Sequence, residues 1–240
     1  MSECYPSTRC KTLQAIENWC NGHDQDSLPV FWLQGPPGIG KTAISKSVAS
    51  YAQQRGVLAA NFFFSIRIGS GCSDGKLLFP TMAHQLVSFH PSLQASISAT
   101  LREDIELPQR SIDIQFRRLF QQPLLFYIQQ SLIDQVPCTP LVIVLDGLDE
   151  CIDHDLMKNI IRNLVAAAPQ LHPTVKLFLA SRPEYYITSI LRNYLQTGDH
   201  VYEYDFQCME WSHSSSDVEV YLRDNLNDIA EKKQWNIQRR

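Results

Sequence analysis

Residues 29–49 read PVFWLQGPPGIGKTAISKSVA, and this stretch decides the fold. A short apolar run leads into a cluster of glycine and proline, and a segment with the pattern of a helix follows. The residues that match the spacing G-x-x-x-x-G-K-[ST] are Gly35, Gly40, Lys41 and Thr42. A loop with this residue spacing binds phosphate groups when it follows a strand and opens a helix, and both conditions are expected here.

A phosphate chain is highly charged and strongly hydrated, so its site needs many donors close together. Glycines allow the backbone to curl until successive N–H groups point inward, and the following helix adds its N-terminal partial charge. Lys41 supplies a full charge near the β- and γ-phosphates, and Thr42 supplies a hydroxyl for Mg²⁺. The predicted nucleotide-binding residues of this loop are Gly35, Pro36, Pro37, Gly38, Ile39, Gly40, Lys41, Thr42 and Ala43. The alternative is a glycine turn beside a surface lysine.

An acidic motif, LVIVLDGLDE, occupies residues 141–150. Asp146 follows five apolar residues, so it ends a buried strand, at the edge where open α/β sheets bind ligands. A phosphate-loop NTPase needs a carboxylate there for its metal, and we therefore predict that Thr42 and Asp146 hold Mg²⁺. Asp149 and Glu150 have two open roles, which are activation of the attacking water and completion of the outer shell of the metal. The alternative is a solvated acidic turn.

A third motif, LASRPE, places Arg182 just past another apolar run. An arginine at that point could reach the γ-phosphate and report its presence, because its charge pairs with phosphate oxygens. The alternative is a salt bridge with a local carboxylate such as Glu184. The predicted catalytic residues are Asp149, Glu150 and Arg182.

Outside these motifs, apolar runs alternate with segments of helical periodicity. Buried strands are expected at residues 30–33, at 56–65 and within 139–151 and 174–184, with a strand nearer the sheet edge at 200–207. Helices are expected at 7–20, capped by Ser7 or Thr8, and at 41–54, 77–89 and 156–168, while 92–135 is expected to be helical with breaks at Pro108 and Pro123. The tail carries a capping box, Ser216 with Glu219. Buried strands alternating with helices predict an α/β fold, with a parallel sheet covered on both faces.

Composition excludes several classes of protein. The 240 residues carry a net charge of −4, which gives no broad basic field for nucleic acid. No apolar run approaches the roughly 18 residues of a membrane span, and the N-terminus lacks the apolar core of a signal peptide. Seven cysteines without a Cys-x-x-Cys pair indicate reduced thiols and a cytoplasmic protein, although Cys151 and His154 have the spacing of metal ligands.

In order and spacing, GPPGIGKT, LVIVLDGLDEC and ASRPE resemble the NACHT class of STAND NTPases, in which a small residue, here Gly147, follows the magnesium aspartate. The chain is more similar still to the large fungal NACHT proteins. It shares with them PSTRCKTLQAIENW before the phosphate loop, FFFS on the second strand and LFPTMAHQL on the next helix. A further shared segment contains Gln115, Phe116, Leu119, Pro123 and Leu124. The resemblance covers about residues 5 to 230.

The resemblance implies a three-layer P-loop NTPase fold, with a mostly parallel five-stranded sheet of order 5-1-4-3-2. It implies an N-terminal helix and linker at 1–28, the NTPase domain at 29–210 and the truncated start of a helical domain at 211–240. It also implies that Thr8 and Arg9 contribute to the base pocket. Such proteins are nucleotide-dependent switches that self-associate or act on partner proteins through flanking domains. Fungal members are associated with non-self recognition and cell death.

We therefore expect a Mg²⁺-dependent domain that binds ATP or GTP, hydrolyses it slowly and acts as a signalling switch. One alternative is a nucleotide-binding assembly module without significant turnover. A phosphoryl transferase is disfavoured, because the acids after Asp146 suit activation of water and no acceptor pocket is recognisable in the sequence.

Overall fold

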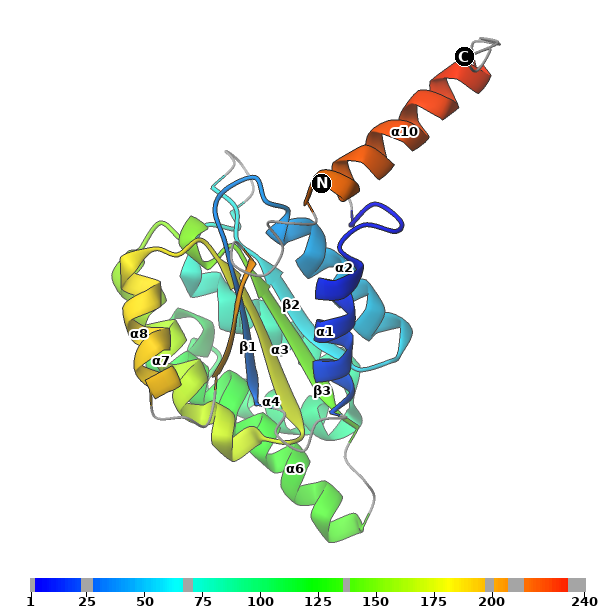
Figure 1. The fold of residues 1–240 in the computed structure, drawn as a ribbon. Coiled ribbons are helices and arrows are strands. Elements are labelled where there is room, and N and C mark those ends of the chain that lie inside the picture. The colour runs from blue at the N-terminus through cyan, green and yellow to red at the C-terminus, as the bar shows by residue number, and fades with distance from the viewer. Residues whose placement is uncertain are drawn as a thin grey trace.

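Five parallel strands form one sheet at the centre of the molecule (Figure 1). The computed structural model describes residues 3–22, 28–66, 71–135, 139–196, 201–206 and 214–232. The strands are β1 (Val30–Gln34), β2 (Leu58–Phe63), β3 (Leu141–Asp146), β4 (Val175–Ser181) and β5 (Val201–Asp205), and their spatial order is β2-β3-β4-β1-β5. This order confirms the expected fold class and the sequence 5-1-4-3-2, and every pair of neighbouring strands is parallel.

The composition of each strand matches its place in the sheet. The three inner strands, β1, β3 and β4, are buried along their whole length, which explains their continuous apolar runs. The edge strand β5 alternates between buried and more exposed residues. The run at 56–65, expected to have no wet face, forms the other edge strand, β2, and its residues Leu58, Asn61 and Phe63 are only half-buried.

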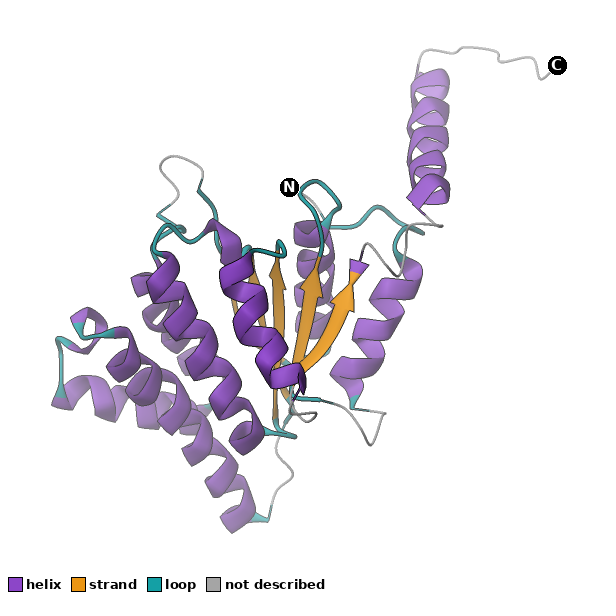
Figure 2. Cartoon of the chain, turned by 60° about the vertical axis from the view of Figure 1, so that its left-hand side comes forward, coloured by secondary structure: helices purple, strands orange, loops and turns teal. Residues whose placement is uncertain are grey.

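Helices cover both faces of the sheet (Figures 1 and 2). The helices α1 (Cys10–Asn21) and α2 (Lys41–Gln54) pack on the face that carries Val142 and Val144. The opposite face, with Ile143 and Leu145, is covered by α3 (Leu78–Phe89), α4 (Pro91–Glu103), α6 (Gln122–Asp134), α7 (His154–Leu171) and α8 (Tyr185–Gln196). Because successive side chains of a strand point to opposite faces, each inner strand contributes to two separate cores.

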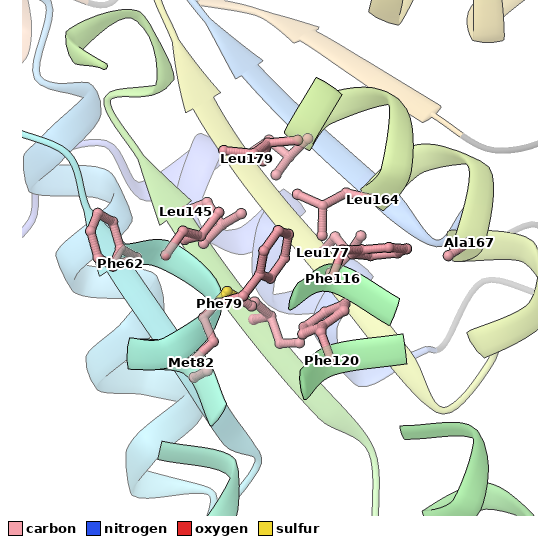
Figure 3. Packing of buried hydrophobic residues seen from close by; sticks show 14 of the residues in the cluster. Phe62, Phe79, Met82, Phe116, Phe120, Leu145, Leu164, Ala167, Leu177 and Leu179 are labelled. Atoms are coloured by element: carbon pink, nitrogen blue, oxygen red, sulfur yellow. The ribbon is translucent and has the colours of Figure 1, made fainter. Parts of the chain in front are cut away.

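The larger core contains an aromatic cluster beneath the second group of helices (Figure 3). Phe79 of α3 meets Phe116 and Phe120 with ring centroids 5.4 and 5.8 Å apart. Leu145 and Leu177 of the sheet belong to the same cluster. This core anchors the strands whose carboxyl ends carry the candidate site.

The segment from Leu107 to Asp134 departs from expectation. Around Pro108 lies the short turn η2 (Leu107–Gln109), as expected. At Pro123, however, the chain stays helical. The short helix α5 (Ile112–Gln115) passes into a π-helical segment, η3 (Phe116–Gln121), and then directly into α6. Proline lacks an N–H, so it is tolerated in the first turn of α6 directly after the wide π turn. The predicted break is therefore wrong.

The first helix also begins differently from the prediction. Arg9, with a left-handed φ of 57°, precedes α1 and makes no side-chain cap. The Thr8 hydroxyl instead donates to the Tyr5 carbonyl at 2.6 Å, so the predicted Ser7 or Thr8 cap is wrong.

The remaining elements are the short turns η1 (Gly75–Leu77) and η4 (Leu148–Glu150) and the last helix, α10 (Ser214–Lys232). This last helix stands away from the body in both views (Figures 1 and 2). It begins two residues before Ser216, whose side chain lies outside the described part, as do Cys138 and Cys208. None of the described helices combines the length and the apolar character needed to cross a bilayer.

Candidate functional site

The loop between β1 and α2 has the backbone that its glycines predict. Gly38 and Gly40 have φ values of 80° and 101°, a region that residues with a side chain rarely adopt. Gly40 directly precedes α2, which begins at Lys41. The loop therefore curls tightly and aims the N-terminal end of α2 at the space above the sheet edge.

Lys41 is folded back onto this loop. Its Nζ donates to the carbonyl oxygens of Gly35 at 2.7 Å and Pro36 at 3.0 Å. Burial lowers the pKa of Lys41, while the charges of Asp149 and Asp146 oppose that shift. The ammonium group thus lies between the loop and the acidic motif.

Asp146 ends β3 and is 2% exposed. Burial raises the pKa of its carboxyl group, and hydrogen bonds from the Thr42 and Ser45 side chains oppose that rise. The Ser45 hydroxyl donates to Asp146 Oδ1 at 2.8 Å. Hydroxyl and carboxylate oxygens are donors that Mg²⁺ prefers, so Thr42 and Asp146 fit such an ion. Sequence reasoning missed Ser45, although its position one helical turn after Lys41 was a signal for it.

Asp149 and Glu150 follow in η4, and their surroundings differ. Asp149 accepts the backbone N–H of Arg182 at 2.8 Å and pairs with its Nε at 3.1 Å. The side chain of Asp149 is 6% exposed, and that of Arg182 is 42% exposed. Among the described residues, Arg182 therefore forms its ion pair with Asp149 and not with the neighbouring Glu184. Glu150 accepts a longer hydrogen bond, 3.2 Å, from the N–H of Ile66.

Gly147 must be small for two reasons. Its φ is +72°, and a Cβ atom there would lie 2.9 Å from the carbonyl oxygen of Phe64. The N–H of Phe64 in turn donates to the Asp146 carbonyl at 2.9 Å. The close approach of the chain after β2 therefore sets the position of the acidic motif.

These residues surround one hollow of about 390 Å³. It is lined by Glu3, Pro37, Gly38, Gly40, Lys41, Thr42, Ala43, Asp146, Gly147, Asp149, Glu150 and Arg182. A smaller hollow of about 180 Å³ shares Thr42, Asp146 and Glu150 and extends to Lys46 and Ser65. Glu3 could not be expected from the sequence, because its approach to the loop depends on the path of the N-terminal segment.

Several predicted residues lie beside this hollow without lining it. Gly35 is overlaid by Ile39 and Phe206, since a Cβ on Gly35 would lie 3.3 Å from each of their side chains. Thr8 is 8% exposed and bonded to Tyr5. Arg9 donates from Nη2 to the Ile39 carbonyl at 3.2 Å, on the outer side of the loop. Both Thr8 and Arg9 are thus near the loop, but neither is among the lining residues.

A parallel sheet of this order, with a glycine-rich loop between β1 and α2, is a P-loop NTPase fold. The family model described as Nephrocystin 3, N-terminal, matches residues 10–182. No curated protein sequence matches the chain. Among solved structures, Cdc6p from Pyrobaculum aerophilum superposes with a TM-score of 0.46 at 14% identity. The match covers 83% of this chain and 45% of that protein, so the chain corresponds to less than half of its length.

Proposed function

Because the chain belongs to the nephrocystin 3 N-terminal family and has a P-loop NTPase fold, we propose that it is a Mg²⁺-dependent, slowly hydrolysing NTPase domain acting as a nucleotide-controlled switch. One observation carries the proposal. The phosphate loop, Asp146, the Asp149–Glu150 pair and Arg182 come from separate parts of the chain and line a single hollow. The motifs shared with NACHT proteins, the fungal ones included, favour a NACHT-like switch with the domain bounds given above. The nucleotide is ATP or GTP.

The phosphate end of the nucleotide would lie in the curl of the loop. Backbone N–H groups around Gly38 and Gly40 would donate to it, and Lys41 would exchange its bonds to the Gly35 and Pro36 carbonyls for phosphate oxygens. Thr42 and Asp146 would hold Mg²⁺, with Ser45 fixing the aspartate. When bound, the metal would supply positive charge to the phosphate oxygens.

The two acids after Asp146 then take different roles. Asp149 is buried, accepts a hydrogen bond from the backbone N–H of Arg182 and forms an ion pair with its guanidinium group, so it is suited to orient that arginine. Glu150 lines both hollows, and among the described residues its carboxylate accepts one hydrogen bond, from Ile66, so it is the better acceptor for a proton from the attacking water. Arg182, 42% exposed at the rim, is suited to sense the γ-phosphate.

The second candidate is an assembly module that binds nucleotide without turnover. The Asp149–Arg182 pair favours it, because a sensor held by an acid must be released before it can assist the reaction. In both cases we propose a cytoplasmic protein that works through self-association or partner proteins, and not through nucleic acid.

The test is to purify the chain, denature it and identify any released nucleotide, with Lys41→Ala as control. ADP or GDP from the wild type alone supports the switch and identifies the base. A bound triphosphate supports the module. If the wild type carries no nucleotide and also fails to bind ATP and GTP in titrations, while remaining folded, the proposed function is wrong.

A further inference from the structure

Arg9 connects three parts of the molecule. Its Nη2 donates to the Ile39 carbonyl of the phosphate loop at 3.2 Å. Its guanidinium group lies over the ring of Phe206, just beyond β5, 4.6 Å from the centroid. Its Nη1 is 3.5 Å from Oδ2 of Asp217, in the first turn of α10, and its backbone N–H donates to the same oxygen at 3.2 Å. Both charged side chains are 18% exposed, so water and salt screen this ion pair less than an open surface pair.

The hydrogen bond from Arg9 to the Ile39 carbonyl orients the N–H of Gly40, a candidate hydrogen-bond donor to phosphate. The Ile39 carbonyl and the Gly40 N–H belong to one trans peptide group, so they point in opposite directions. Arg9 holds the carbonyl from the outer side, and the N–H therefore points away from Arg9, where Gly40 lines the hollow. A charged donor on the carbonyl also polarises the peptide and strengthens its N–H as a donor. An anion on the N–H strengthens the bond to Arg9 in the same way.

The side chains around the Ile39–Gly40 peptide are closely packed. The side chains of Ile39 and Phe206 both lie beside Gly35, where an added Cβ would be 3.3 Å from each. Phe206 in turn supports the guanidinium group of Arg9. Because Gly35, Phe206 and Arg9 are packed side by side, a shift of the loop should displace Arg9.

In the described part of the chain, the helix at the end of this path is attached to the N-terminal segment by contacts of Arg9 and Tyr5 with its first half. The Tyr5 ring meets Tyr221 edge-on at 5.2 Å, close to the ion pair of Arg9 with Asp217. Beyond this point α10 stands clear of the body (Figures 1 and 2), and Val218, Leu222 and Leu226 are each more than half exposed. Loss of one of these contacts should therefore alter the position of α10 more than it alters the structure of the sheet and its helices.

We propose that Arg9 couples the phosphate loop to α10, so that nucleotide binding tightens the attachment of this helix and its detachment weakens nucleotide binding. The proposal rests on the proposed function only in taking a nucleotide as the ligand. The two effects are linked and must be equal in free energy. Arg9 is then a positioning residue that acts through the Ile39–Gly40 peptide, a role different from the base contact implied by the resemblance.

The first experiment compares Asp217→Asn with Glu219→Gln. Both remove one negative charge from α10, but Glu219 pairs with Arg223 on the exposed surface. Calorimetric titration with Mg-ADP and Mg-ATP should show binding weaker by about five-fold or more for Asp217→Asn, which lies outside the hollow. Glu219→Gln should bind as the wild type does. Equal affinities for all three chains would overturn the coupling.

The second experiment measures amide hydrogen exchange in residues 217–229 with and without nucleotide. Exchange there should slow on binding in the wild type and in Glu219→Gln, and should be indifferent to nucleotide in Arg9→Gln. A purely structural role of Arg9 would change the exchange rate without changing its response to nucleotide, which also contradicts the proposal. A wild type that binds no nucleotide overturns the proposed function and the coupling together. A wild type that binds but shows no coupling overturns this inference alone.

Discussion

At the scale of single residues, two neighbouring acidic side chains have different roles because their surroundings differ. Asp149 and Glu150 follow one another, yet one is buried against Arg182 and the other lines two hollows. A sequence can place both acids at the end of a strand, but it cannot say which one is already engaged. That choice depends on Arg182, 33 residues further along the chain.

Replacement of Glu150 by Gln tests this assignment. The amide keeps the shape and the acceptor oxygen but cannot take a proton, so the rate of phosphate release should fall by about 10²–10⁴-fold while nucleotide affinity changes little. Steady-state phosphate release and calorimetry measure the two quantities. Asp149→Asn is the comparison, because it should loosen Arg182 without removing the base. A larger loss of turnover in Asp149→Asn than in Glu150→Gln would reverse the two roles.

Gly147 offers a second test at this scale, with Gly56 as its matched control. Both have left-handed φ values, +72° and +69°, but a Cβ on Gly56 meets nothing within 4 Å. Gly56→Ala should lower the free energy of unfolding by about 1 kcal/mol from backbone strain alone. Gly147→Ala adds the contact with the Phe64 carbonyl and should lower it by about 2–4 kcal/mol. Urea denaturation measures both free energies of unfolding. Similar decreases for the two variants would contradict the prediction, because they would mean that the backbone at Phe64 moves to make room for the new Cβ at little cost.

The sequence was sufficient for the residue types of the candidate site and insufficient for their connections. The phosphate loop and the acidic motif could be predicted because each is a local pattern at a strand end. The approach of Glu3, the bond from Ser45 to Asp146 and the ties of Arg9 depend on segments far apart in the chain. No periodicity in a single sequence records such distances.

At the scale of elements, β2 lies at the edge that the expected strand order gives it, but its apolar run suggested full burial and three of its residues are only half-buried. The apolar composition of a strand indicates that it contacts the core, and an edge strand also does so. The composition does not indicate whether the strand has a neighbouring strand on both sides. The open edge has a side-chain cover, since Gln85 of α3 accepts the Asn61 N–H and donates to the Asn61 carbonyl, both at 2.8 Å.

Removal of that cover should be measurable. Gln85→Ala breaks both bonds and should lower the free energy of unfolding by about 2 kcal/mol. It also exposes the backbone of an edge strand, so self-association should increase with protein concentration. Chemical denaturation and sedimentation check the two effects. His84→Ala, at an exposed position on the same helix, should show neither, and equal behaviour of the two variants would contradict the role of Gln85.

At the scale of the whole molecule, apolar cores on both faces stabilise the sheet, whereas the buried carboxylate at the carboxyl end of β3 lowers the stability of the metal-free fold. Burial raises the pKa of Asp146 above its ordinary value. Between the ordinary and the raised pKa, the folded chain binds more protons than the unfolded chain, so stability falls as pH rises through that window. At neutral pH the ionised carboxylate therefore destabilises the metal-free fold.

Asp146→Asn removes this cost and should raise the Tm of the metal-free protein by about 2–4 °C at pH 7, with a smaller difference below the window. The same change should abolish the dependence of nucleotide affinity on Mg²⁺. Thermal unfolding in a chelator from pH 4 to pH 8 checks the first effect. Asp155→Asn is the control with the opposite sign, because the hydrogen bond from Lys158 lowers the pKa of Asp155 and its loss should not raise Tm. A lower Tm for Asp146→Asn at neutral pH would contradict the argument.

The wide turn at η3, from Phe116 to Gln121, has a consequence for how this segment could have arisen. A π turn holds one residue more than an α turn, and each residue of an α-helix turns the chain by about 100°. The extra residue therefore rotates everything after it, so that α5 faces α7 while α6 lies against α4. The wide turn at η3 has the geometry that insertion of a single residue into an α-helix would produce. A related chain lacking one residue between Ile112 and Gln122 should have a regular helix there, and different side chains on the buried side of its second half.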